Sequence, residues 1–74
     1  MTTEKPFVKI DIERAERTIT VYALDDDGND LFTPEVFAWG DDEVFRNLAT
    51  ARVHAELSAE KHAERLGGTY GANE

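Results

Sequence analysis

Residues 7–13 read Phe-Val-Lys-Ile-Asp-Ile-Glu, and from Val8 onward this stretch alternates apolar with charged side chains. Val8, Ile10 and Ile12 therefore share one face, and their charged neighbours share the other. Alternation with a period of two, carried by β-branched residues, is typical of a strand with one buried face. The stretch predicts a strand that packs against a core.

Two further strands are expected directly after it. Residues 18–24 are again rich in β-branched side chains, and residues 31–39 are expected to return beside them. Between the two, residues 25–30 contain Asp-Gly and Gly-Asn, which supply the positive φ angles that hairpin turns require. Pro34 has no backbone N–H, so the third strand is expected at an edge or at a bulge. These features predict a three-stranded antiparallel meander.

The second half of the chain predicts one long helix, over residues 41–66. Asp41, Asp42 and Glu43 follow Gly40, and acidic side chains favour the positive end of a helix dipole. Nothing from residue 44 to 66 breaks a helix, and Gly67-Gly68 is expected to end it. At helical spacing, one apolar stripe contains Val44, Phe45, Leu48, Ala51, Ala55, Ala59 and Leu66.

The predicted fold is therefore α+β: a three-stranded antiparallel meander followed by one long C-terminal helix packed on one face. A chain of 74 residues is expected to form one small domain, residues 1–74. Its ordered core is predicted over about residues 6–68, with a frayed tail at residues 69–74.

Composition excludes several classes of function. The chain has 16 acidic residues against 8 Lys and Arg, a formal net charge of -8 and no cysteine. Without cysteine, disulfides and thiolate zinc sites are excluded. The acidic balance argues against direct binding to nucleic acid. No apolar run is long enough for a membrane span, and the N-terminus lacks the pattern of a signal peptide, so a cytoplasmic setting is expected, the host's cytoplasm if a phage encodes the protein.

No constellation for catalysis, a cofactor or a metal is predicted. The acidic turn fits a calcium loop poorly, because Ala23 and Pro34 occupy two of the ligand positions. His54 and His62 lie eight residues apart, about 12 Å along a helix, which is too far for one metal ion. Ser58 is the chain's one serine and would share that helix with both histidines, without a glycine-rich elbow. We therefore expect no enzyme activity.

Acidic side chains gather in three segments, residues 25–30, 41–43 and 56–64, which makes a partner with a basic surface the expected ligand. In residues 56–64, carboxylates one helical turn apart lie about 6 Å from one another, which is near the interval between phosphates along a nucleic-acid strand. A plain solvated helix face is the alternative interpretation. The expected partner-binding residues are Asp25, Asp26, Asp27, Asp30, Asp41, Asp42, Glu43, Glu56, Glu60 and Glu64.

Four apolar residues are expected to form a second contact surface. Val53 and Leu57 lie opposite the helix stripe, and Phe37 and Trp39 alternate on one face of the third strand, assigned to the sheet face that also carries Tyr22. A two-fold homodimer that buries these side chains is predicted. Isolated exposed apolar residues are common, however, and a docking site for another protein is the alternative.

Together these patterns favour a non-enzymatic, acidic protein-binding module that blocks the basic surface of a nucleic-acid-handling protein. In being small, acidic and cysteine-free, the chain is similar to inhibitors of phages and mobile elements, including anti-CRISPR and DNA-mimic proteins. That likeness is compositional and covers no alignable segment. A homo-oligomeric structural or assembly subunit is the alternative function.

Overall fold

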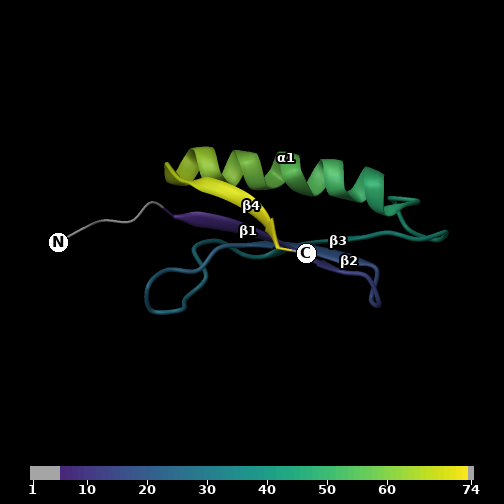
Figure 1. The fold of residues 1–74 in the computed structure, drawn as a ribbon, viewed down its shortest axis with the longest axis horizontal. Coiled ribbons are helices and arrows are strands. Elements are labelled where there is room, and N and C mark those ends of the chain that lie inside the picture. Colours follow the sequence, from purple (N-terminus) through teal and green to yellow (C-terminus); the bar gives the residue numbers. More distant parts are fainter. Residues whose placement is uncertain (1–5, 74) are drawn as a thin grey trace.

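The computed structural model describes residues 6–73, which form a mixed sheet covered on one face by a helix (Figure 1). The elements follow one another as β1 (Phe7–Glu13), β2 (Thr18–Tyr22), β3 (Glu35–Ala38), α1 (Leu48–Leu66) and β4 (Thr69–Asn73). The predicted α+β fold, a meander followed by a long helix, is confirmed. Glu74, the last residue of the predicted tail, lies outside the described residues.

The sheet has four strands in the order β3-β2-β1-β4. Strands β1, β2 and β3 pair antiparallel, as predicted, with Ile10 opposite Val21 and Ile19 opposite Phe37. The fourth strand corrects the prediction of a frayed tail. Residues 69–73 return from the helix and pair parallel to β1, with Val8 beside Tyr70. β1 is therefore a central strand, and β3 and β4 are the two edges.

The core joins large side chains of the sheet to small side chains of the helix. Strands β1 and β2 contribute β-branched residues, of which Ile10, Ile19, Val8 and Val21 are fully buried. The helix contributes Ala51, Ala55, Ala59 and Ala63, one in each turn. Alanine lets a helix backbone lie close to the sheet, and the β-branched residues then fill the space between the layers.

The helix begins seven residues later than predicted, at Leu48. Asn47 is the N-cap: its side chain accepts a hydrogen bond of 2.9 Å from the Thr50 backbone N–H. Residues 41–46 form turns instead, because Phe45 bridges to Trp39 and its carbonyl accepts a hydrogen bond from the Gly40 N–H. Val44, predicted on the buried stripe, is 89% exposed. The predicted end of the helix is confirmed, with Gly67 as its C-cap.

Strand β3 is shorter than the predicted 31–39 and faces differently. Pro34 directly precedes it, and the strand lies at the sheet edge as the proline predicts. Because Phe37 pairs with the buried Ile19, its side chain faces the helix and not the open face of the sheet. Phe37 and Trp39 both pack partly buried against the core, so their predicted position on an uncovered face is wrong.

Candidate functional site

Helix α1 presents four rows of side chains, each spaced by four residues. The alanine row faces the sheet. A second row, on the flank toward β4, starts with Arg52 and continues as Glu56, Glu60 and Glu64; we call these three glutamates the acidic row. Val53, Leu57, Lys61 and Arg65 form the outer row, and His54, Ser58 and His62 lie on the flank toward β3. Different chemistry therefore faces the two edges of the sheet.

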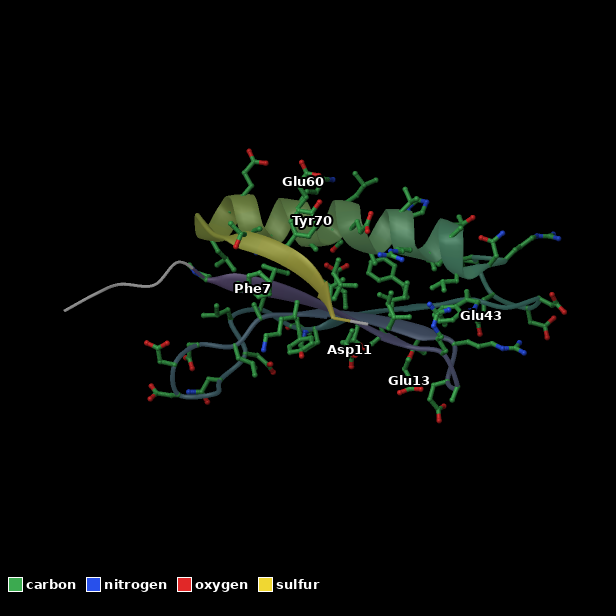
Figure 2. All side chains as sticks on the ribbon, viewed as in Figure 1. Phe7, Asp11, Glu13, Glu43, Glu60 and Tyr70 are labelled. Carbon is green, nitrogen blue, oxygen red and sulfur yellow. The ribbon has the colours of Figure 1, made fainter. Side chains whose placement is uncertain are left out.

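The flank toward β4 borders a groove of about 520 Å³, which we call the β4 groove. Figure 2 shows Glu60 and Tyr70 close together, one on the helix and the other on β4. The residues that line the groove are Glu60, Ala63, Glu64, Gly68, Thr69 and Tyr70. The groove thus combines two carboxylates, an aromatic ring and the backbone of an edge strand.

The acidic row is only partly neutralised. Arg52 Nε lies 3.3 Å from Glu56 Oε1, so the first glutamate forms an ion pair one turn along the helix. Glu60 and Glu64 are exposed, and no ion pair within residues 6–73 engages their carboxylates. The spacing of like charges was predicted from the sequence, and the structure adds that the carboxylates of Glu60 and Glu64 border the β4 groove.

The other two acidic segments lie at opposite ends of the molecule (Figure 1). Residues 25–30 form the tip between β2 and β3, where Asp25 Oδ1 accepts hydrogen bonds from the backbone of Asp27 and Asn29. Asp25 therefore organises the predicted hairpin turn, with Gly28 at a φ of 85°. Residues 41–43 lie beyond the far end of β3. The structure therefore does not bring the ten predicted acidic residues onto one surface.

A polar cluster that the sequence did not predict joins β3 to the helix. The Ser58 hydroxyl donates a hydrogen bond of 2.6 Å to Glu35 Oε1, and His62 Nε2 lies 2.6 Å from the same oxygen. Phe32 stacks on the His62 ring, with the ring centroids 3.8 Å apart. This cluster borders a second groove, of about 400 Å³, between β3 and α1.

The arrangement of this cluster differs from that of a catalytic triad. A serine nucleophile needs a base that accepts its proton, usually a histidine oriented by a carboxylate. Here the Ser58 hydroxyl donates to the carboxylate of Glu35 itself. Across residues 6–73, no group of three or more His, Asp or Glu side chains is arranged to hold a metal ion. We interpret the cluster as a polar link between the edge strand and the helix.

This link makes stability depend on pH. Hydrogen bonds from Ser58 and then from His62 hold the pKa of Glu35 below its ordinary value of 4.5. A lowered pKa means that the carboxylate stabilises the fold above pH 4.5 and loses that contribution as the pH falls through the folded-state value. We expect the difference in unfolding free energy between the wild type and Glu35→Gln to be largest above pH 4.5 and to shrink below it.

Urea unfolding measured between pH 3 and pH 7 checks this expectation. The matched variant is Ser58→Ala, which removes the larger cause of the lowered pKa and should weaken the same pH dependence. Parallel curves for wild type and Glu35→Gln across the whole range would contradict the role of this cluster.

The predicted apolar patch is divided by the fold. Val53 and Leu57 are 55% and 52% exposed on the outer row, as expected for residues opposite the buried stripe. Phe37 and Trp39 are half-buried and pack against the core between β3 and the helix. The ring centroids of Phe37 and Phe45 are 5.9 Å apart. Val53 and Leu57 are thus the exposed part of that patch.

Comparison of the chain with family models, with curated proteins and with solved structures found no match. Its function has to be inferred from its residues and their arrangement. No helix within residues 6–73 combines the length and the apolar character that crossing a membrane requires.

Proposed function

We propose that the protein is a non-enzymatic binding module whose acidic surface docks onto a basic surface of a nucleic-acid-handling protein and blocks it. The observation that carries the proposal is the acidic row, where two exposed glutamates without ion pairs in the described chain border the β4 groove. Inhibitors of this kind occur in phages and mobile elements, and the proposal includes that this protein is one of them.

The charge of the whole molecule supports the same function. A net charge of -8 on 74 residues attracts basic surfaces over a distance and speeds association. The acidic clusters at the two ends of the molecule extend this field beyond the helix. Close contact, in contrast, needs a surface that a partner can fit, and the acidic row beside the β4 groove supplies one.

The acidic row carries an energetic cost that packing does not explain. Glu60 lies one turn from both Glu56 and Glu64, and like charges at this spacing destabilise a helix by a few tenths of a kcal/mol per pair. Glu60 is exposed, so nothing in the core needs a carboxylate there. Residues that oppose stability without a structural reason are expected at functional surfaces.

This cost gives a direct prediction for Glu60→Lys. The lysine would lie one turn after Glu56 and one turn before Glu64, which turns two repulsive pairs into two attractive ones. We expect the variant to be more stable by about 1 kcal/mol, as measured by urea unfolding. We also expect it to bind the partner more weakly, because the acidic row is interrupted.

Binding is measured by immobilising the protein and exposing it to lysate of its native host. The proteins retained should be nucleic-acid-binding, and duplex DNA or raised salt should release them. Glu16→Lys is the matched control, since it changes the net charge equally at an exposed residue outside the β4 groove. Retained proteins that neither DNA nor salt can displace would contradict the proposed function.

A further inference from the structure

The two edges of the sheet differ in how open they are. At the β3 edge, the backbone N–H of Trp39 donates a hydrogen bond to the Arg17 carbonyl, on the side of β2. The backbone N–H of the next residue, Gly40, points to the other side and donates to the Phe45 carbonyl. Phe45 therefore covers the far end of that edge. At the near end, Pro34 has no N–H to offer. Proline and covering segments are devices by which proteins prevent a further strand from adding to an edge.

Among residues 6–73, neither a proline nor a covering segment protects the β4 edge. The Thr69 N–H donates a hydrogen bond to the Pro6 carbonyl, so the backbone polar groups of Thr69 face β1. Those of Gly71, two residues later in the same strand, face β1 as well. Backbone groups alternate along a strand, and those of Tyr70 and Ala72 therefore point away from β1, to the outer side of the sheet. The strand reads Thr-Tyr-Gly-Ala-Asn, without a proline or a charge. No backbone hydrogen bond within the described part of the chain engages the outward groups of Tyr70 and Ala72, which are therefore open to pairing.

The surroundings of this edge select the kind of strand that could pair with it. An added strand would run along the β4 groove, below the carboxylates of Glu60 and Glu64 and beside the ring of Tyr70 (Figure 2). Side chains of the added strand alternate between the two faces of the sheet. Those on the helix side would meet the two carboxylates, which favour lysine or arginine.

We propose that the β4 edge binds an extended, basic segment of the partner protein as a fifth strand of the sheet. Backbone hydrogen bonds at Tyr70 and Ala72 provide affinity, and Glu60 and Glu64 provide selection for positive charge. This proposal rests on the proposed function and names the part of the partner that is bound. A second copy of this chain fits less well, because pairing two β4 edges would bring two acidic rows together.

The first experiment uses three fluorescently labelled ten-residue peptides. One alternates Lys with Val, one has Glu in place of Lys, and one keeps Lys but has Pro in place of two central Val residues. Fluorescence anisotropy measures their binding to the full chain. We expect the Lys-Val peptide to bind at least tenfold more tightly than the other two, and the amide protons of Tyr70 and Ala72 to exchange more slowly in its presence.

The second experiment locates the site with matched variants. Glu60→Gln combined with Glu64→Gln and Glu13→Gln combined with Glu16→Gln both change the net charge from -8 to -6. We expect the first pair to weaken binding of the Lys-Val peptide about tenfold and the second to leave it nearly unchanged. Ala72→Pro removes one outward N–H and should weaken binding while urea unfolding still shows a folded protein.

Each remaining outcome overturns a distinct statement. Equal losses in the two double variants would show that net charge attracts the peptide, which overturns the β4 site and leaves the proposed function standing. Equal binding of the proline peptide would overturn strand addition. Equal binding of the Glu peptide would overturn both proposals. Sedimentation as a dimer, with Tyr70 and Ala72 protected in the absence of peptide, would show that a second copy occupies the edge and would overturn the partner segment.

Discussion

Replacing Ile10 by alanine is expected to remove most of the protein's free energy of unfolding at room temperature. Ile10 is fully buried on the central strand, between Val21 on β2 and β4 on the other side. Truncating a buried isoleucine costs about 2 to 5 kcal/mol. A domain this small is expected near the lower end of the usual range of stability, roughly 5 kcal/mol. The Ile10 side chain thus contributes much of the free energy of unfolding.

The helix cannot compensate for this loss. Its buried residues are all alanines, and an alanine has no flexible atoms that could move into a cavity below it. The surrounding β-branched side chains have few rotamers, so they cannot fill the space either. We therefore expect the cost of Ile10→Ala to fall in the upper half of the range for such truncations, near 4 kcal/mol.

Urea unfolding, followed by circular dichroism and by the fluorescence of Trp39, measures the effect. Val36→Ala is the matched control, because Val36 is also β-branched and lies in the same sheet but is 61% exposed. Its loss should cost well under 1 kcal/mol. Similar shifts of the unfolding midpoint for Ile10→Ala and Val36→Ala would contradict the position of the core.

The elements that the sequence predicts well are those whose pattern is local. Strand β1 is predicted to the residue because Val8, Ile10 and Ile12 alternate with charges, and one face of that strand is buried. The end of the helix is predicted because Gly67 takes the left-handed conformation, at a φ of 71°. In both cases the signal lies within a few residues of the feature that it determines.

The start of the helix shows where a local signal is overruled. Asp41 to Glu43 would suit a first turn, but Phe45 packs near Phe37 and bridges to Trp39, and a helix through these residues would break that bridge. Asn47 and Thr50 were the signal that could have corrected the boundary, because the Asn47 side chain caps the Thr50 N–H. The packing of Phe45 is a tertiary contact that a local pattern does not contain.

The candidate site was predictable in part for the same reason. The spacing of Glu56, Glu60 and Glu64 places them in one row on any helix, and the structure confirms that row. That β4 lies beside the row depends on pairing between residues about 60 positions apart in the chain, Phe7 with Thr69. Glu35 meets Ser58 and His62 in a similar way, across 23 and 27 positions. Contacts of this kind leave no periodic signal in the sequence.

Gly68→Ala is expected to detach β4 from the sheet. A methyl group at Gly68 would overlap the carbonyl oxygen of Pro6 and would lie 2.8 Å from its carbonyl carbon. Backbone atoms cannot move aside as the end of a side chain can, and the next residue, Thr69, makes its hydrogen bond to that same carbonyl. We expect a loss of roughly 3 kcal/mol, the upper end of the usual range for overpacking, or local release of residues 69–73.

Gly67→Ala is the control that separates sterics from backbone conformation. Gly67 adopts a φ of 71°, but a methyl group there would meet no atom within 4 Å. Its replacement should cost about 1 kcal/mol, the penalty for a left-handed L-residue, and should leave β4 in place. Amide exchange at Gly71 distinguishes the two variants, because that N–H is protected only while β4 pairs with β1. Equal exchange in both variants would contradict the close approach at Gly68.

The same pair of variants connects the fold to the proposed interaction. If residues 69–73 leave the sheet in Gly68→Ala, the protein loses the edge to which the partner segment would add, although Glu60 and Glu64 remain on the helix. Binding of the Lys-Val peptide should then fall in Gly68→Ala to the level seen for the proline peptide, and should persist in Gly67→Ala. Binding that survives in Gly68→Ala while Gly71 exchanges freely would place the peptide on the helix carboxylates alone. Strand pairing at β4 would then contribute nothing to its affinity.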